Sequence, residues 1–212
     1  MSLPGPFQSC ASLILASASP RRRVLLQDLG LEFEVIAARV EEKPSTGEMP
    51  EKFVLRAACD KAGTVARQHG SAWVLGADTV VVDGSRILGK PEDAEDALSV
   101  LLALAGRKHL VHTGYCLENL EEGVSVSRLV TTEVRFSSFS VEIARSYVAT
   151  GEPLDKAGAY GIQGCGSFLV QGIDGSYSNV VGLPLAEVMQ DLLHYEVVRP
   201  RREYLQQQFG SR

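Results

Sequence analysis

The sequence predicts an α/β protein in which strands and helices alternate along the chain, and three observations predict it. A short apolar run, Leu13 to Leu15, leads directly into a helical pattern that begins at Pro20. A longer apolar run covers residues 73–82 and has the length of a buried strand. Helical patterns at residues 50–69 and 92–106 lie between strand patterns rather than in a block of their own.

The composition limits the classes of protein that remain. A chain of 212 residues with 45% hydrophobic content can bury the core of one large domain or of two packed lobes. The net charge of −5 argues against a general nucleic-acid-binding surface. No run reaches the ~18–20 apolar residues that span a bilayer, so we expect no membrane partner. Four scattered cysteines without metal-ligand spacing indicate free thiols in a reducing compartment, and therefore a cytoplasmic protein.

The expected domain organisation is simple. Residues 1–11 form a loose N-terminal lead-in, residues 12–198 a single domain of two lobes, and residues 199–212 an Arg-rich tail that we expect to be peripheral. Cys10 to Ser19 resembles the end of a signal peptide, but no basic region precedes it. We therefore interpret it as a core strand.

The first helix has an unusual N-terminus. Ser19 suits the N-cap, Pro20 the first helical position and Gly30 the C-terminal stop. We expect its buried face to contain four apolar residues: Val24, Leu25, Leu26 and Leu29. Residues 21–23 are all arginine, which costs ~0.3–1 kcal/mol beside the positive end of a helix dipole compared with an acidic residue. Guanidinium groups, hydroxyls and free N–H groups together suit a polyphosphate. An exposed kinase target or a solvated charge run remain the alternatives.

The next two elements carry charged residues that have two interpretations each. After a strand at residues 33–36, the adjacent acids Glu41 and Glu42 are either solvated or ligands of a hard metal such as Mg²⁺. The helix at residues 50–69 carries Lys61 beside its apolar stripe. Its ammonium either extends along the stripe to solvent or points into a cleft.

The apolar strand at residues 73–82 is interrupted by Asp78 and Thr79. A carboxylate there is costly unless it is paired, catalytic or bound to a metal. Asp83-Gly84 is a hairpin signal, and residues 86–88 form the return strand. This hairpin would bring Lys90 back toward the end of the sheet that holds Asp78.

The second half of the chain continues the alternation. We expect a helix at residues 92–106, whose buried face contains Ala94, Ala97, Leu98, Leu101 and Leu104. The further elements are strands at 110–117, 124–136 and 168–170, and helices at 139–150 and from Pro184 to Tyr195. Residues 155–164 include three glycines, which indicates either a backbone that approaches a ligand closely or a tight surface loop. Gln163 in this segment could bind a base edge through its amide.

These motifs together resemble the Maf family of nucleoside triphosphate pyrophosphatases. The resemblance extends over about residues 12–193, and its motifs appear in the family's order. The matching segments are Ser17 to Arg22, Val40 to Glu42, Lys61, Gly76 to Thr79, Gly89 to Pro91, Asp155 to Gly164 and Asn179 to Pro184.

The resemblance implies a fold and an activity. The fold is a mixed, elongated and twisted sheet flanked by helices, with two lobes around a central cleft, similar to inosine triphosphatases. The activity is the Mg²⁺- or Mn²⁺-dependent hydrolysis of a nucleoside triphosphate to the monophosphate and pyrophosphate, which clears unwanted nucleotides from the pool. The alternative is a non-catalytic nucleotide-binding regulator of septum formation and cell division. The family also suggests a homodimer.

The resemblance further implies a substrate branch. Relatives that act on 7-methyl-GTP have an aromatic residue in place of Arg21, Gln in place of Thr79, and Ser-Glu-Gly in place of residues 162–164. This chain is similar to the other branch, which takes dTTP, UTP and modified pyrimidine nucleotides.

Roles are also implied for individual residues. Asp78 is the expected general base and a metal ligand, and Glu42 is the second metal ligand, with Glu41 less favoured. The phosphates are expected to contact four cations: Arg21, Arg22, Lys61 and Lys90. Three residues are expected to line the substrate site: Ser17, Thr79 and Gln163.

Overall fold

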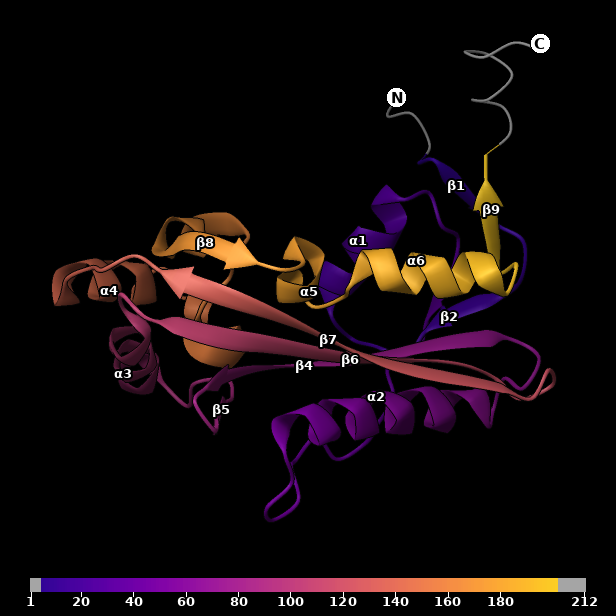
Figure 1. Cartoon of the computed structure of the whole chain (residues 1–212), viewed down its shortest axis with the longest axis horizontal. Coiled ribbons are helices and arrows are strands. Elements are labelled where there is room, and N and C mark those ends of the chain that lie inside the picture. The colour runs from indigo at the N-terminus through magenta and orange to yellow at the C-terminus, as the bar shows by residue number, and fades with distance from the viewer. Residues whose placement is uncertain (1–4, 202–212) are drawn as a thin grey trace, which may run out of the picture.

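A twisted sheet built on three long strands forms the centre of the molecule (Figure 1). The computed structural model describes residues 5–201. The long strands are antiparallel neighbours: β4 (Trp73–Asp83), β6 (Lys108–Asn119) and β7 (Val124–Phe136). Shorter strands complete the sheet in the order β3-β2-β4-β6-β7-β8, with β5 beside β4. Their bounds are β2 (Leu13–Leu15), β3 (Glu34–Val35), β5 (Arg86–Leu88) and β8 (Val170–Asp174). Because β2 is parallel to β3 and β4, the sheet is mixed, as predicted.

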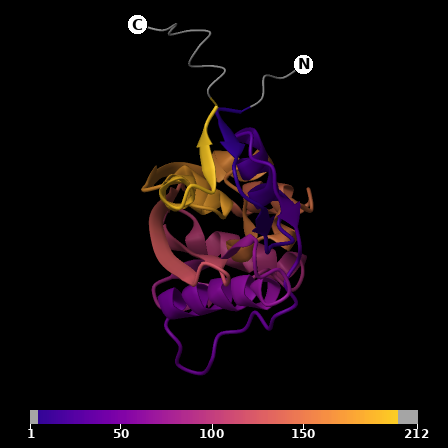
Figure 2. The same ribbon diagram turned by 90° about the vertical axis from the view of Figure 1, so that its right-hand side faces the viewer.

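Helices cover both faces of this sheet. The long helix α2 packs on one face, and α1 and α6 lie on the opposite face at one end (Figures 1 and 2). Helices α3 and α4 lie at the other end of the sheet (Figure 1). The helices are α1 (Pro20–Asp28), α2 (Pro50–Ala66), α3 (Ala94–Leu104), α4 (Val141–Val148), α5 (Tyr177–Val181) and α6 (Leu185–His194). Three 3₁₀ segments follow α4: η1 (Glu152–Asp155), η2 (Ala157–Ala159) and η3 (Gly164–Leu169).

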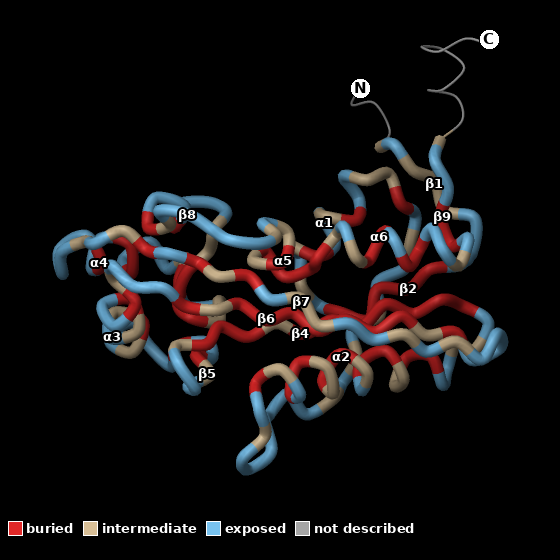
Figure 3. The backbone as a smooth tube through the Cα atoms, viewed as in Figure 1, coloured by how far each residue is buried: buried red, intermediate tan, exposed pale blue. Residues whose placement is uncertain are grey.

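Separate hydrophobic cores occupy the two ends of the sheet, which gives the two lobes. One core surrounds Trp73 and includes Leu26 of α1 and Leu192 of α6. The other surrounds Phe136 and includes Leu101 of α3. Figure 3 shows the buried backbone running through both ends along the long strands.

The two ends of the described chain differ from the expectation. Phe7–Ser9 form a strand, β1, where the sequence predicted a loose lead-in. It pairs antiparallel with β9 (Val198–Pro200), so Arg199 and Pro200 belong to this strand pair rather than to a peripheral tail. Sequence periodicity could not show this because each strand has only three residues. Residues 202–212 of the expected tail lie outside the described residues.

Three local predictions were wrong in detail. The buried residues of α1 are Arg22 and Leu26, whereas Val24 is 47% exposed. Ala94 is exposed because it is the first residue of α3, before the helix reaches the core. Leu169 ends a 3₁₀ segment, and the strand that was expected at residues 168–170 begins only at Val170.

Two broader expectations can be compared with residues 5–201. None of the helices in that range has the length and apolar character needed to cross a bilayer. Cys10, Cys59, Cys116 and Cys165 are free thiols, as predicted.

Candidate active site

The candidate site lies where one edge of β4 has no strand beside it. On that edge, β2 pairs with β4 only as far as Leu75, and β5 pairs with it only from Val81 onward. A cavity of about 350 Å³ opens at this gap. Nine residues with a predicted role line it: Ser17, Arg21, Arg22, Glu42, Lys61, Asp78, Thr79, Lys90 and Gln163. Glu41, the less favoured metal ligand, does not.

The close packing of α2 on the sheet brings Lys61 to this edge. A Cβ atom on Gly76 would lie 2.3 Å from the carbonyl oxygen of Ala58 in α2. A Cβ atom on Gly114, opposite Asp78 in β6, would lie 2.5 Å from the carbonyl oxygen of Val54. Only glycine leaves room for helix and sheet backbones to approach this closely. The two glycines therefore set the height of Lys61 above β4.

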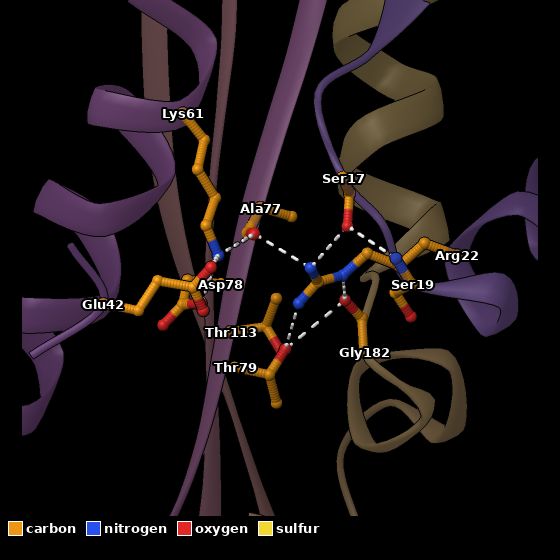
Figure 4. Close-up of polar contacts among 10 residues, drawn as sticks. All are labelled: Ser17, Ser19, Arg22, Glu42, Lys61, Ala77, Asp78, Thr79, Thr113 and Gly182. Atoms are coloured by element: carbon orange, nitrogen blue, oxygen red, sulfur yellow. Dashed lines mark hydrogen bonds and ion pairs between the residues drawn. The ribbon is translucent and has the colours of Figure 1, made fainter. Parts of the chain in front are cut away.

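Lys61 joins the two candidate metal ligands. Its Nζ donates to Asp78 Oδ1 at 2.7 Å and lies 3.1 Å from Glu42 Oε1 (Figure 4). Asp78 is only 7% exposed, whereas the Glu42 side chain is 54% exposed. The structure thus pairs Asp78 with an ammonium and also gives it access to the cavity. Of the two interpretations of Lys61, the cleft is the one observed.

Arg22 occupies the opposite side of the same β4 edge. Its Nε donates to the Gly182 carbonyl at 2.7 Å, and Nη1 donates to Ser17 Oγ at 3.0 Å and to the Ala77 carbonyl at 2.9 Å. Nη2 donates to Thr79 Oγ1 at 3.0 Å. Burial lowers the pKa of Arg22, and the negative charges of Asp78 and Glu42 oppose that shift. Because most of its donors are already used, Arg22 connects β4 to distant segments of the chain, and it is also a candidate phosphate ligand.

The N-terminus of α1 keeps the features that suit an anion. Ser19 occupies the N-cap position, but its side chain makes no capping hydrogen bond, contrary to expectation. Instead, the Ser19 N–H donates to Ser17 Oγ. The first turn contains no acidic residue, so the helix dipole is not offset there. Arg21 faces Asp155 of η1 across a 3.8 Å ion pair whose side chains are 36% and 70% exposed.

Loops from the second lobe close the other side of the cavity. The β4–β5 hairpin forms as predicted, and Lys90 follows it as an exposed residue on the cavity wall. The Gly158 N–H donates to the Gly89 carbonyl at 3.0 Å, which fastens the glycine-rich segment to the residues beside Lys90. Gln163 is exposed and lines the cavity from this segment.

Three residues near the site were given no role from the sequence. Thr113 of β6 contacts Thr79 Oγ1 at 2.9 Å, and a polar residue in an apolar strand was an available signal. Asp155 pairs with Arg21, but nothing in the sequence joins these distant residues. The cavity-lining Tyr160 has its hydroxyl 2.8 Å from Nε2 of the buried His109. Burial lowers the pKa of His109 to about 4.

A divalent cation would have few protein ligands here. Among the described residues, no group of three or more His, Cys, Asp or Glu side chains is arranged to hold a metal. Glu42 and Asp78 supply carboxylate oxygens on either side of one ammonium. Mg²⁺ is commonly held by one or two carboxylates plus substrate phosphates, so this donor set fits a metal that arrives with a phosphorylated ligand.

Taken together, the helix N-terminus, the cations and the paired carboxylates define a protein that binds a phosphorylated ligand in a cleft between two lobes. The model of the Maf-like protein family matches residues 12–195, and the chain belongs to this family.

Curated relatives extend the comparison. A dTTP/UTP pyrophosphatase of Desulfotalea psychrophila is 53% identical over 186 residues, which cover 88% of this chain and 95% of the relative. A dTTP/UTP pyrophosphatase of Myxococcus xanthus is 52% identical over 177 residues, or 84% and 89% of the two chains. Among solved structures, the Staphylococcus aureus Ham1 protein aligns with a TM-score of 0.47 and 16% identity, covering 87% of this chain and 99% of that one.

Proposed function

We propose that this chain hydrolyses dTTP, UTP and related pyrimidine nucleoside triphosphates to the monophosphate and pyrophosphate, in the presence of Mg²⁺ or Mn²⁺. The observation that carries this proposal is the meeting of Lys61, Glu42 and Asp78 at the open edge of β4, inside a cavity that Arg21 and Lys90 also line. The relatives named dTTP/UTP pyrophosphatase support the choice of substrate.

The proposed reaction needs a base and an anchored leaving group. A water oxygen attacks the α-phosphorus, the bond to the oxygen bridging the α- and β-phosphorus atoms breaks, and pyrophosphate leaves with that oxygen. The water proton goes to Asp78, whose Oδ1 accepts from Lys61, so we assign the transfer to Oδ2. Little covalent chemistry is left to the protein, and positioning and charge neutralisation supply most of the catalysis.

The cations divide this work. Arg21, the free N–H groups at the start of α1 and Lys90 bind the phosphate oxygens, and Lys61 orients Asp78 while contributing charge. Arg22 contributes charge and holds Ser17, Thr79 and the Gly182 carbonyl in position. When bound, a divalent metal neutralises phosphate charge beside Glu42 and Asp78. We expect a chelator to abolish pyrophosphate release and added Mn²⁺ or Mg²⁺ to restore it.

In this proposal, the glycine-rich segment at residues 155–164 selects the nucleobase of the substrate. The Gln163 amide offers one acceptor and two donors, which can match the alternating donor and acceptor groups on the edge of a uracil or thymine ring. We also propose a homodimer, which sedimentation analysis would test, and a cytoplasmic location.

Replacing Asp78, the proposed general base, tests the proposed function. Asp78→Asn should lower kcat by about 10²–10⁴-fold because the amide cannot accept the water proton. The matched control is Asp28→Asn, which changes an exposed acid at the C-terminal end of α1, outside the cavity. Pyrophosphate release is measured over a panel of nucleotides, with circular dichroism to verify folding. Tight nucleotide binding without turnover by the unaltered chain would contradict the proposal and favour the regulator of septum formation.

A further inference from the structure

We propose that Arg56 and Glu48, which lie outside the cavity, are positioning residues that hold Glu42 in the site by clamping the loop at residues 36–49. The inference rests on the proposed function, because the role of Glu42 as a metal ligand belongs to it. The two residues contact the loop on the side away from the candidate site, and neither lines the cavity that contains Asp78.

The loop needs such a clamp because little else holds its second half. It joins β3 to α2 without regular secondary structure, and residues 41–47 are all exposed (Figure 3). Ile36 and Ala38 pack against a hydrophobic cluster around Ala62 and Val74, which fixes the first half. Glu42 comes four residues after Ala38, where this apolar attachment has ended.

The clamp is a bidentate ion pair between Arg56 and Glu48, with additional contacts to the loop backbone. Arg56 Nε donates to Glu48 Oε1 at 2.8 Å, and Nη2 donates to Glu48 Oε2 at 2.7 Å. Nη2 also donates to the Lys43 carbonyl at 3.0 Å. Glu48 Oε2 in turn accepts from the Ser45 N–H at 2.8 Å. The guanidinium thus binds the chain at the residue directly after Glu42.

Arg56 is itself held on a rigid element. Nη1 lies 3.3 Å from Asp60 Oδ2, and the guanidinium carbon lies 5.5 Å from the centre of the buried Phe53 ring. Both contacts are within α2, the helix that also carries Lys61. One helix therefore binds the loop twice, at Lys43 through Arg56 and at Glu42 through Lys61.

The arrangement selects between two adjacent acids. Ala38 and Glu42 line the candidate site, whereas Glu41, Lys43 and Ser45 line a second cavity of about 620 Å³, which Arg56 also lines. The loop thus separates the two cavities. A rotation of the loop would bring Glu41 into the candidate site in place of Glu42, and the contact of Arg56 with the Lys43 carbonyl opposes that rotation.

A double-mutant cycle tests the proposal. Arg56→Ala should raise the half-saturating Mn²⁺ concentration about tenfold while changing kcat at saturating Mn²⁺ little, since outer contacts of metal ligands typically act on affinity. Glu42→Gln should itself raise the half-saturating Mn²⁺ concentration, and adding Arg56→Ala to it should raise that concentration no further. Independent effects that multiply would overturn the proposal. Arg67→Ala, which removes an exposed arginine of the same helix region that contacts Thr64, is the control and should leave Mn²⁺ dependence unchanged.

Two readouts do not depend on activity. Amide hydrogen exchange at residues 43–48 should be faster in Arg56→Ala and in Glu48→Gln than in the unaltered chain or in Arg67→Ala. Mn²⁺ binding with a non-hydrolysable triphosphate analogue, followed by electron paramagnetic resonance, should weaken in the same two variants. Unchanged exchange would overturn the clamp even if the enzyme is active. Absence of pyrophosphate release by the unaltered chain would refute the proposed function. Faster amide exchange at residues 43–48 in Arg56→Ala and Glu48→Gln would still support the clamp in that case.

Discussion

The Arg22 guanidinium is both a candidate phosphate ligand and a joint between distant parts of the chain. It binds the Gly182 carbonyl, which is 160 residues away in the sequence, together with Ala77 and Thr79 of β4. A lysine ammonium at this position could not reproduce the planar fork that these acceptors require. We therefore expect Arg22 to contribute to stability as well as to the positive charge of the cavity.

Replacing Arg22 by lysine tests this double role. Each buried acceptor that loses its donor should cost about 1–3 kcal/mol, so Arg22→Lys should lower the free energy of unfolding clearly. Urea denaturation followed by circular dichroism measures the change. Arg23→Lys, at the exposed neighbouring position, is the control. Equal stability of the two variants would contradict the structural role.

His109 gives the stability a dependence on pH. Burial lowers its pKa to about 4 in the folded chain, below the ordinary value of 6.5. Between these values the unfolded chain binds more protons, so stability falls as the pH drops from about 6.5 toward 4 and is unaffected by this group above 6.5. The full loss is of the order of 3 kcal/mol.

Urea denaturation at several pH values checks this expectation. His109→Gln keeps a hydrogen-bonding group near the Tyr160 hydroxyl but cannot titrate. The difference in unfolding free energy between the unaltered chain and this variant should change with pH only below about 6.5. A difference that does not vary with pH would show that His109 is not the group responsible.

At the level of secondary-structure elements, the approach of α2 to the sheet determines the site. Gly76→Ala would place a methyl group 2.3 Å from the Ala58 carbonyl oxygen and 2.7 Å from the Ala62 nitrogen. The helix must move away, which should cost about 1–3 kcal/mol and separate Lys61 from Asp78. We expect lower stability together with lower kcat. Gly70→Ala, whose added Cβ would have its nearest neighbour at 4.0 Å, is the control and should change neither quantity.

The whole molecule combines a negative net charge with a positive cleft. The chain carries −5 overall, whereas the cavity lining has more cations than acids. Its cations are Arg21, Arg22, Lys61, Lys90 and Lys156, and its acids are Glu42, Asp78 and Asp155. Salt screens the attraction between the solvent-accessible cations of the cavity, such as Lys90, and a triphosphate, so KM should rise several-fold between about 0.05 and 0.5 M salt.

Substitution of Lys90 tests whether the cleft causes this dependence. Lys90→Gln removes one exposed cation of the cavity and should flatten the response of KM to salt. Arg145→Gln, at an exposed position of α4 outside the cavity, should leave the response unchanged. Parallel salt curves for all three proteins would contradict an electrostatic role for the cleft.

The sequence by itself determined most of the elements. The hairpin at Asp83-Gly84, the helices that begin at Pro20 and Pro50, and the long strands formed at or near the predicted residues, because periodicity and turn chemistry depend on neighbours only a few positions apart. Its motifs, together with the family resemblance, also identified nine of the residues that line the cavity. Their catalytic and binding roles remain predictions.

Only the tertiary structure decided which of these residues meet. The pairing of Lys61 with both Asp78 and Glu42, the use of Arg22 as a joint, and the β1–β9 strand pair all join segments that are distant in sequence. Which of Glu41 and Glu42 lines the cavity likewise depends on the course of the loop at residues 36–49, which contacts α2 through Arg56. Such contacts follow from how helices and strands pack in three dimensions, and no local pattern of residues encodes a partner on another element.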